Sequence, residues 1–538
     1  MTLKSANIRR LVLLTCCCVC AFASSATAGA PDKNKTLSRA DRALRAGDFE
    51  RAEKIYREML AKDDGDIDAR LGLSRTLLKQ RRLQDSFDHA ARVLAIQPLS
   101  ARAHALLGAA ILASGDFRQS IEEFRTALTL KDNEAIAIAG LAMVDYYENR
   151  VLRCVAALRR AVEIDPNEPD HVFNLAQAAA RSERYKEAAD AYERFLIVAP
   201  RTDADRRARI RGLIDFLRYL GQQESLYSLD GPERTTVGFE TPDSRPVVKV
   251  RINGSKQLFR FVLDTGSGMS VVSEETAKKI GIKSVARGGM ARAVGGGGRF
   301  EIVYGYLSSI DIGDIRIGNV PVYIRHFFDE QNPVDGYLGI AAISRLLTTV
   351  DYGTHQLTLS RERNESSETI AAGVTKPVSA DELSRPGVNI PVRTTSSGFL
   401  SGEVIIDGIG KPLNFIIDTG ATVTVLSEKA AAMEEAQQFI RPGRMRVYGA
   451  AGITEDVRIA SLPRIAIGSY SRDRIDAAVL DLEPVNETAG FQQSGILGGN
   501  FLRNYRIIFH FDKSFVRFES LDGGGATKPL EPPDVTKQ

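Results

Sequence analysis

A period of 34 residues in the N-terminal half constrains the fold of this chain more than any other feature of its sequence. One phase of the period is occupied by Pro98, Asp132, Pro166 and Pro200. A fixed period of this length predicts helix pairs that stack in series, because one pair cannot bury its apolar face alone. Another phase holds only small side chains, which two helices need where they approach closely: Ala52, Ser86, Ser120, Cys154 and Ala188.

This pattern resembles the tetratricopeptide repeat, with about five copies between residues 33 and 201. Gly47 and Gly115 stand where the two helices of a copy would turn. The resemblance implies an all-α superhelix over residues 33–222, closed by a polar, arginine-rich and solvated helix from about residue 203 to 220. Its concave groove would bind a peptide or a partner protein that the sequence does not identify. The alternative is a structural spacer.

Residues 1–28 carry the pattern of an export signal peptide. The basic residues Lys4, Arg9 and Arg10 precede an apolar stretch, and Ala26-Thr27-Ala28 is a small-residue cleavage site. The apolar stretch is shorter than the roughly 20 residues that cross a bilayer. We therefore expect an exported protein, periplasmic or secreted, with no membrane span after signal cleavage. An uncleaved anchor is the alternative.

Composition argues against several classes of function. Of the five cysteines, only Cys154 lies beyond the signal, so we expect no disulfide and no cysteine-based metal site. The six histidines lack the spacing of zinc hydrolases, and no Gly-x-Ser-x-Gly motif is present. We expect neither a metal nor a cofactor. The 71 basic and 68 acidic residues nearly balance, which argues against a nucleic-acid partner.

The helical periodicity ends near Gly221, and short alternating strands bounded by glycine and proline follow. A polar linker is expected over residues 363–385. It divides this half of the chain into two β-rich units, residues 235–362 and residues 386–520. The tail, residues 521–538, is rich in glycine and proline and is expected to be disordered.

Each β-rich unit carries an apolar strand that runs into an Asp-Thr-Gly motif, at residues 261–267 in the first and residues 415–421 in the second. A hairpin precedes each motif, with Asn253-Gly254 and Asp407-Gly408 at the turns. A glycine-rich turn begins 31 residues after each motif aspartate. A single Asp-Thr-Gly would be weak, but two copies in matching surroundings indicate a duplicated structural unit.

This design resembles the retropepsin-like aspartic peptidases, and the resemblance covers most of residues 235–520. It implies two all-β acid-protease lobes in a multidomain chain, with a peptide or protein as substrate. It assigns Asp264 and Asp418 as the catalytic pair that activates a water for peptide-bond hydrolysis. Two carboxyl groups about 3 Å apart cannot both ionise, so such a pair shares a proton.

The resemblance also implies roles for the residues around the aspartates. Thr265 and Thr419 would form hydrogen bonds across a pseudo-twofold axis. Gly266 and Gly420 would let the backbone pass close to the carboxylates. Gly339 and Gly498 would support the catalytic loops from beneath. The flap tips that close over substrate would be formed by Gly296, Gly297, Gly449 and Gly452.

Two alternatives stay open at this point. Asp264 and Asp418 could pair within one chain, or each could pair with its counterpart in a second chain. The linker is long enough to let the two lobes face each other, and the high effective concentration of two lobes in one chain favours the internal pair. A non-catalytic peptide-binding scaffold on the same fold is the alternative to an enzyme, although both motifs are intact.

Turn formation accounts for Asp335 and Asp351, and Tyr448 could contact substrate or pack in its strand.

Overall fold

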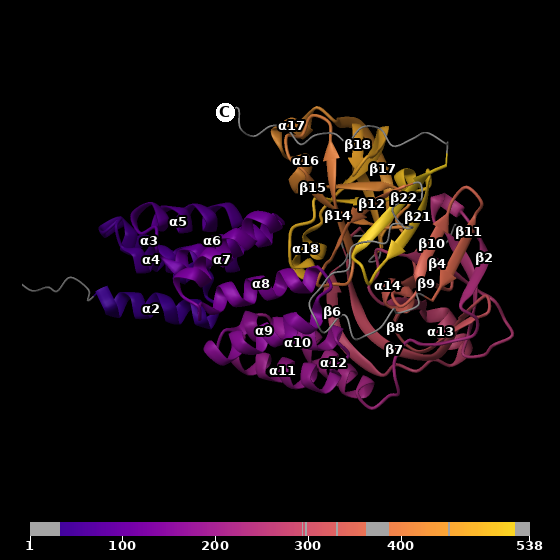
Figure 1. Ribbon diagram of the computed structural model, residues 1–538, viewed down its shortest axis with the longest axis horizontal. Helices are drawn as coiled ribbons and strands as arrows, with labels where there is room; N and C mark the ends of the chain where they lie inside the picture. The colour runs from indigo at the N-terminus through magenta and orange to yellow at the C-terminus, as the bar shows by residue number, and fades with distance from the viewer. Residues whose placement is uncertain are drawn as a thin grey trace, which may run out of the picture.

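The computed structural model describes residues 33–292, 294–295, 298–329, 332–361, 387–449 and 452–521. The predicted signal, the predicted linker and all but the first residue of the predicted tail lie outside these residues. The described chain has an all-α N-terminal region followed by a β-rich region that contains two sheets, and the two regions lie side by side (Figure 1).

The described N-terminal residues form helix pairs in series, as the period predicts. All five residues of the small-residue phase have fully buried side chains. Asp48, Asp66 and Asp116 accept backbone N–H bonds at helix starts, which caps them. The helices are α2 (Lys33–Ala46), α3 (Phe49–Lys62), α4 (Ile67–Lys79), α5 (Leu83–Ile96), α6 (Ala101–Ser114), α7 (Phe117–Leu130), α8 (Ala135–Tyr147), α9 (Val151–Ile164), α10 (Pro169–Arg181) and α11 (Tyr185–Val198).

The first β lobe follows these helices. Its strands pair in the order β3-β4-β9-β5-β8-β7-β6, and β3 also pairs with β7. The elements are β1 (Ser228–Asp230), β2 (Arg234–Glu240), β3 (Val247–Ile252), β4 (Phe259–Asp264), β5 (Ser270–Ser273), α13 (Glu274–Ile280), β6 (Ala286–Arg292), β7 (Arg299–Ile312), β8 (Ile315–Arg325), β9 (Gly336–Gly339), α14 (Ile340–Ile343), β10 (Leu347–Asp351) and β11 (Gln356–Ser360).

The second lobe repeats this topology strand for strand, in the order β14-β15-β20-β16-β19-β18-β17, with β14 also pairing with β18. The duplication seen in the sequence is therefore a duplication of structure. The elements are β12 (Val388–Pro391), β13 (Arg393–Thr394), β14 (Leu400–Ile406), β15 (Leu413–Ile417), β16 (Thr424–Ser427), α16 (Glu428–Ala431), α17 (Glu434–Gln437), β17 (Ile440–Gly449), β18 (Gly452–Ile467), β19 (Tyr470–Leu480), α18 (Glu483–Ala489), β20 (Gly495–Leu497), α19 (Gly499–Leu502), β21 (Tyr505–His510) and β22 (Phe515–Ser520).

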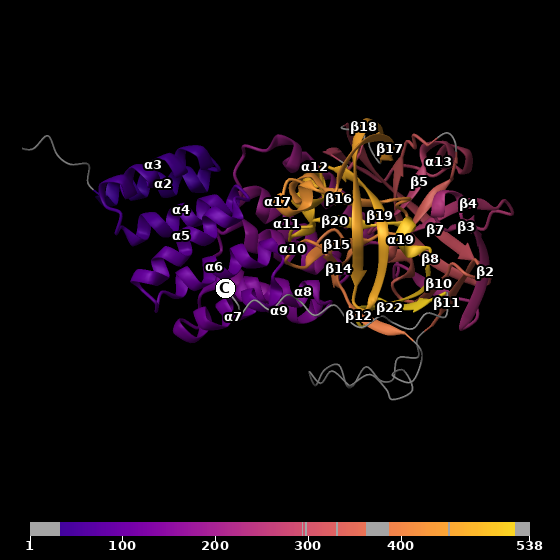
Figure 2. The same cartoon turned by 90° about the horizontal axis from the view of Figure 1, so that it is seen from above.

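The last hairpins of the two units form one sheet, which crosses the boundary between the two β-rich units expected from the sequence. Strand β10 pairs antiparallel with β21, so that Thr348 lies opposite Phe509. The shared sheet runs β12-β22-β21-β10-β11-β2 and joins the lobes (Figure 2). Its apolar face adds Val350, Ile507 and Phe518 to a buried core that both lobes share. The shared sheet fixes the two lobes relative to each other.

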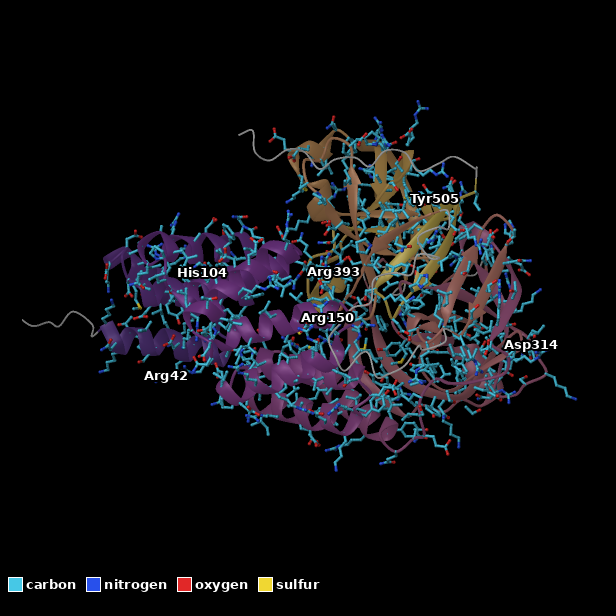
Figure 3. The ribbon with its side chains drawn as sticks, viewed as in Figure 1. Arg42, His104, Arg150, Asp314, Arg393 and Tyr505 are labelled. Carbon is cyan, nitrogen blue, oxygen red and sulfur yellow. The ribbon has the colours of Figure 1, made fainter. Side chains whose placement is uncertain are left out.

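The helical region contacts both lobes. Phe117 packs edge-on against Phe491 of the second lobe at 4.9 Å between ring centroids. The guanidinium of Arg393 lies over the same Phe117 ring at 3.9 Å, and Figure 3 places Arg393 at this junction. Phe216 stacks on Tyr304 of the first lobe at 4.3 Å. The repeats are therefore held against the β-rich region at two places.

The arginine-rich helix α12 (Ala204–Leu220) lies between the repeats and the first lobe rather than capping them toward solvent. Gly212 packs so tightly on the Arg287 carbonyl and on Gly288 that no side chain would fit. Arg209 donates to the backbone carbonyl of Met290 at 2.9 Å. The side of α12 that carries Gly212 packs on strand β6, whereas Arg206 and Arg211 of the same helix are exposed to solvent. Within the described residues, no helix is both long enough and apolar enough to span a bilayer.

Candidate active site

The two motif aspartates stand at equivalent ends of equivalent strands. Asp264 is the last residue of β4, and Asp418 directly follows β15. Each of these strands is paired in parallel with a short strand, β9 or β20, which comes from the later part of the same lobe. The two lobes face each other across this point, so the motifs from distant parts of the sequence meet.

The threonines of the two motifs hold the loops together through four hydrogen bonds. The backbone N–H of Thr265 donates to Oγ1 of Thr419 at 3.1 Å, and the reciprocal bond is 3.0 Å. The two hydroxyls donate across the interface to the carbonyls of Ile417 and Leu263, at 2.8 and 2.6 Å. Both threonine side chains are fully buried. The arrangement is symmetric and crosses from lobe to lobe.

The motif glycines lie against the carboxyl group of the opposite lobe. A Cβ atom added to Gly266 would overlap the Asp418 carboxyl group, and one added to Gly420 would lie 2.6 Å from Oδ1 of Asp264. Each glycine also donates its N–H to the aspartate of its own motif, at 2.9 Å for Asp264 and 2.7 Å for Asp418. The two carboxyl groups are therefore neighbours within one chain.

Burial is the main cause that raises the pKa of both carboxyl groups. The charge of Asp418 and a side-chain hydrogen bond with it raise the pKa of Asp264 further, well above its ordinary value. Burial also raises the pKa of Asp418, while N–H bonds from Gly420 and Ala421 and the bond with Asp264 oppose that rise. The pKa of Asp264 is therefore raised by burial and by its neighbour together, whereas hydrogen bonds counteract the rise at Asp418, and the two groups titrate as a pair.

Gly339 and Gly498 lie against the backbone of the segments that follow the two motifs. A Cβ atom on Gly339 would lie 2.6 Å from the backbone carbon of Met269, and one on Gly498 would overlap the backbone of Val423. The N–H of Gly339 donates to the hydroxyl of Ser270 at 3.1 Å. Thr424 accepts the equivalent bond from Gly498 at 3.4 Å.

Sequence reasoning missed Ser270 and Thr424. Both hydroxyl residues stand six positions after the motif aspartate of their lobe, so their equal spacing was a usable signal. Asn500 was also missed. Its Oδ1 accepts from both the N–H and the hydroxyl of Thr424, at 2.9 and 2.8 Å.

Two hairpins, β6–β7 and β17–β18, reach over the aspartates and meet at their tips. A Cβ atom on Gly449 would lie 2.5 Å from the Val294 carbonyl and 2.6 Å from the Cα of Gly295. Gly452, which begins β18, has a φ of +132°, a conformation that favours glycine. The predicted tip residues Gly296 and Gly297 lie outside the described residues. The described parts of both turns contact each other.

A cavity of about 1760 Å³ contains the aspartates and extends to the helices. Its walls include both carboxyl groups, both hairpins and Tyr448. It also reaches residues on the inner face of the helical region, among them Tyr146 and Phe173. The helical groove and the space around the aspartates are thus one continuous volume.

Other candidate residues from the sequence have structural explanations. Cys154 is fully buried, and burial raises the pKa of its thiol to about 12. Asp351 accepts the N–H groups of Gly353 and Thr354 in a turn. Asp335 instead binds the backbone N–H of Arg260 and a threonine hydroxyl. Among the described residues, no group of three or more His, Cys, Asp or Glu side chains could hold a metal ion.

Comparison with known families agrees with the geometry. Residues 248–342 and 403–501 match the family model described as Aspartyl protease. Residues 43–110 and 140–205 match models described as Tetratricopeptide repeat. The chain is therefore similar to aspartyl proteases in two segments and to tetratricopeptide repeats in two others. Comparison with curated proteins gives no match.

Several solved structures are similar to part of this chain. A thermophilic TPR protein from Thermus thermophilus is 20% identical, covering 34% of this chain and 99% of that chain with a TM-score of 0.30. MamA from Desulfovibrio magneticus is 19% identical, covering 30% and 92% with a TM-score of 0.23. The pilF protein of Pseudomonas aeruginosa is 15% identical, covering 35% and 86% with a TM-score of 0.26.

Proposed function

We propose that this chain is an aspartic endopeptidase of retropepsin-like type, in which Asp264 and Asp418 of one molecule form a single catalytic dyad. The observation that carries the proposal is the contact of each motif glycine with the carboxyl group of the opposite lobe. The reciprocal threonine bonds support it, because they fix both loops about one pseudo-twofold axis.

In this proposal the dyad activates a water that lies between the two carboxyl groups. Asp418 is the ionised member, since backbone N–H groups of Gly420 and Ala421 stabilise its charge. It accepts a proton from the water as the oxygen attacks the scissile carbonyl carbon. Asp264 is the protonated member and donates a hydrogen bond to the carbonyl oxygen. When the tetrahedral species collapses, the carbon–nitrogen bond breaks and Asp418 gives the proton that it took from the water to the leaving amine. The carbonyl re-forms as part of the new carboxyl group, and Asp264 keeps its proton, so the dyad returns to its starting state.

The two hairpins act as flaps in this reaction. Because their tips touch each other, we expect them to part when a substrate enters and to cover it when they close again. Closure removes water from the cavity, which strengthens the hydrogen bonds made to the reacting carbonyl.

The helical repeats recruit the substrate. The support is the continuity of one cavity from the aspartates to the inner helical face, where Phe173 and Tyr146 provide aromatic contact surface. A protein substrate would thus engage the groove with one segment and the dyad with another. The pattern of residues 1–28 supports export, which places the reaction in the periplasm or outside the cell.

The test is cleavage of a peptide library at mildly acidic pH by the parent chain and by Asp264→Asn and Asp418→Asn. Each substitution is expected to lower the cleavage rate by about 100-fold or more, since each removes one half of the acid–base pair. Thermal unfolding of both variants checks that they are folded. If the parent binds peptides and a statine-type inhibitor without cleaving any peptide, the non-catalytic scaffold is correct and the proposal is wrong.

A further inference from the structure

The cations in the wall of the cavity differ in whether the protein pairs them with a carboxylate. Several have an acidic partner within ion-pair distance: Lys79 with Glu168, Arg81 with Glu483, Arg245 with Asp329, Arg292 with Glu487 and Arg345 with Glu183. Arg206 and Arg209 of α12 also line the cavity, but neither has a carboxylate at ion-pair distance within the described ranges. The part of the wall that α12 forms therefore carries two guanidinium groups without an acidic partner.

The charged residues beside Arg206 on α12 are each engaged elsewhere. Asp203 caps the helix by accepting the backbone N–H of Arg206 at 2.8 Å, so it binds the main chain and not the guanidinium. Asp205 pairs with Arg299 of the first flap. Arg209 donates one N–H group to the flap backbone. The guanidinium of Arg206, by contrast, makes no hydrogen bond to the described part of the chain.

Two aromatic rings position the guanidinium of Arg206. Its central carbon lies 4.8 Å from the ring centroid of Phe173 and 5.2 Å from that of Phe195, and the two centroids are 5.1 Å apart. Contact with aromatic faces restricts where a guanidinium can lie without occupying its N–H donors. Arg206 is exposed, so a carboxylate from another molecule can approach it.

Two side-chain amides lie beside this aromatic platform on α10. Asn174 follows Phe173 directly, and Gln177 stands one turn later, so the three residues share one side of the helix and all line the cavity. Both amides are half-buried, and neither has a hydrogen-bond partner among the residues that the structure describes. An amide can donate and accept, which suits the peptide groups of a bound chain.

We propose that this end of the cavity is an exosite, a binding site away from the dyad, at which Arg206 binds the carboxylate of an acidic residue in the substrate. The inference rests on the proposed peptidase function and names its substrate class: peptides with an acidic residue at a fixed distance from the cleaved bond. The cavity is continuous from the dyad to α12, so one peptide can occupy both places.

The exosite acts on binding and not on the chemical step. Arg206 does not touch the reacting atoms, so its contact with the substrate is the same before and during bond cleavage, which lowers KM and leaves kcat unchanged. An ion pair at an exposed arginine is weak, and we expect an effect of about five-fold on KM. Salt screens such a pair, so the effect should shrink as the ionic strength rises.

The experiment uses pairs of peptides that share one cleaved sequence and differ by a single Glu or Gln, placed at successive positions away from the cleaved bond. At about pH 5.5 the glutamate is ionised. For the parent chain we expect a short run of positions at which the Glu peptide has a KM about five-fold lower than the Gln peptide, with the same kcat. This arm uses the unaltered protein and does not depend on the folding of a variant.

Arg206→Met keeps an unbranched apolar stem against the two rings and removes the charge. It is expected to abolish the difference within each pair, because the KM for the Glu peptide rises to that for the Gln peptide. Arg211→Met is the matched control, since Arg211 is exposed on the same helix and does not line the cavity. The control should keep the preference for Glu. Circular dichroism checks that both variants are folded.

A binding measurement separates this inference from the proposed function. Pools of random peptides centred on a statine unit, with Glu or Gln at one scanned position, are bound to the parent and to Arg206→Met, and fluorescence anisotropy gives their affinities. If the parent cleaves no peptide but binds the Glu pools more tightly through Arg206, the exosite stands and the proposed function is wrong. Equal KM values and equal affinities for Glu and Gln at every position, or a preference that Arg206→Met retains, overturn the exosite and leave the peptidase intact.

Discussion

Thr265 and Thr419 each accept the other's backbone N–H on the side-chain hydroxyl, at 3.0 and 3.1 Å, although they lie 154 positions apart in the chain. This reciprocal contact ties the catalytic loops of the two lobes into one unit. The proposed dyad depends on it, because the carboxyl groups are carried on the residues directly before the threonines.

Removing a threonine hydroxyl should therefore loosen the lobe interface. Thr265→Val keeps the side-chain shape but leaves the N–H of Thr419 and the carbonyl of Ile417 without their partner. We expect a loss of about 1–3 kcal/mol in the free energy of unfolding, measured by denaturant titration. Thr265→Ser retains the hydroxyl and serves as the control. Equal stability of the valine variant and the parent would contradict this account of the loops.

The motif glycines should tolerate no side chain. Gly420→Ala places a Cβ atom against the Asp264 carboxyl group, so it should displace that group and lower peptide cleavage by about 100-fold. Gly410→Ala is the matched control in the same lobe, because a Cβ atom there meets nothing within 4 Å. Cleavage assays of both variants, with circular dichroism to check folding, decide the point. Parent-like activity in Gly420→Ala would contradict the close approach.

The raised pKa of Asp264 predicts a pH-dependent stability. In the folded protein the carboxyl group keeps its proton above the pKa of an unfolded aspartate, about 3.9. Its stabilising contribution is complete below that pH and is lost as pH rises toward the raised folded pKa. Asp264→Asn cannot ionise, so its melting temperature relative to the parent should increase between about pH 4 and pH 7. A constant difference between the two proteins would contradict the raised pKa.

The contact between α12 and the first flap should also be testable. Gly212→Leu is expected to push β6 away from α12, which should speed amide hydrogen exchange across β6 and slow peptide cleavage. Gly221→Ala at the end of the same helix is the control, since an added Cβ atom there makes only ordinary contacts. Unchanged exchange in β6 would show that α12 does not hold the flap.

Much of this architecture could be predicted from local sequence. The 34-residue period identified the helix pairs, and Asn253-Gly254 identified a hairpin turn in which both residues have positive φ. The repeated Asp-Thr-Gly and its equal spacing to the flap turns identified the paired loops. These signals are local, or are copies of one another within the chain.

The rest depends on contacts between distant segments. The pairing of β10 with β21 joins the last hairpins of two different units. The sequence of each strand is equally compatible with a strand that ends its own unit, so the pairing could not be predicted. From its sequence, the arginine-rich α12 is expected to be a solvated helix, and only the structure shows that its Gly212 packs against β6.

Complementation between the two aspartate variants tests the central claim most directly. Asp264→Asn and Asp418→Asn should each be inactive, and an equimolar mixture should stay inactive, because each chain still lacks one carboxyl group of its own dyad. If each aspartate instead pairs with its counterpart in a second chain, each variant keeps one intact pair and would cleave peptide before mixing. If Asp264 pairs with Asp418 of a second chain, mixing would restore part of the parent cleavage rate. Recovered peptide cleavage in the mixture would therefore contradict a single intramolecular site.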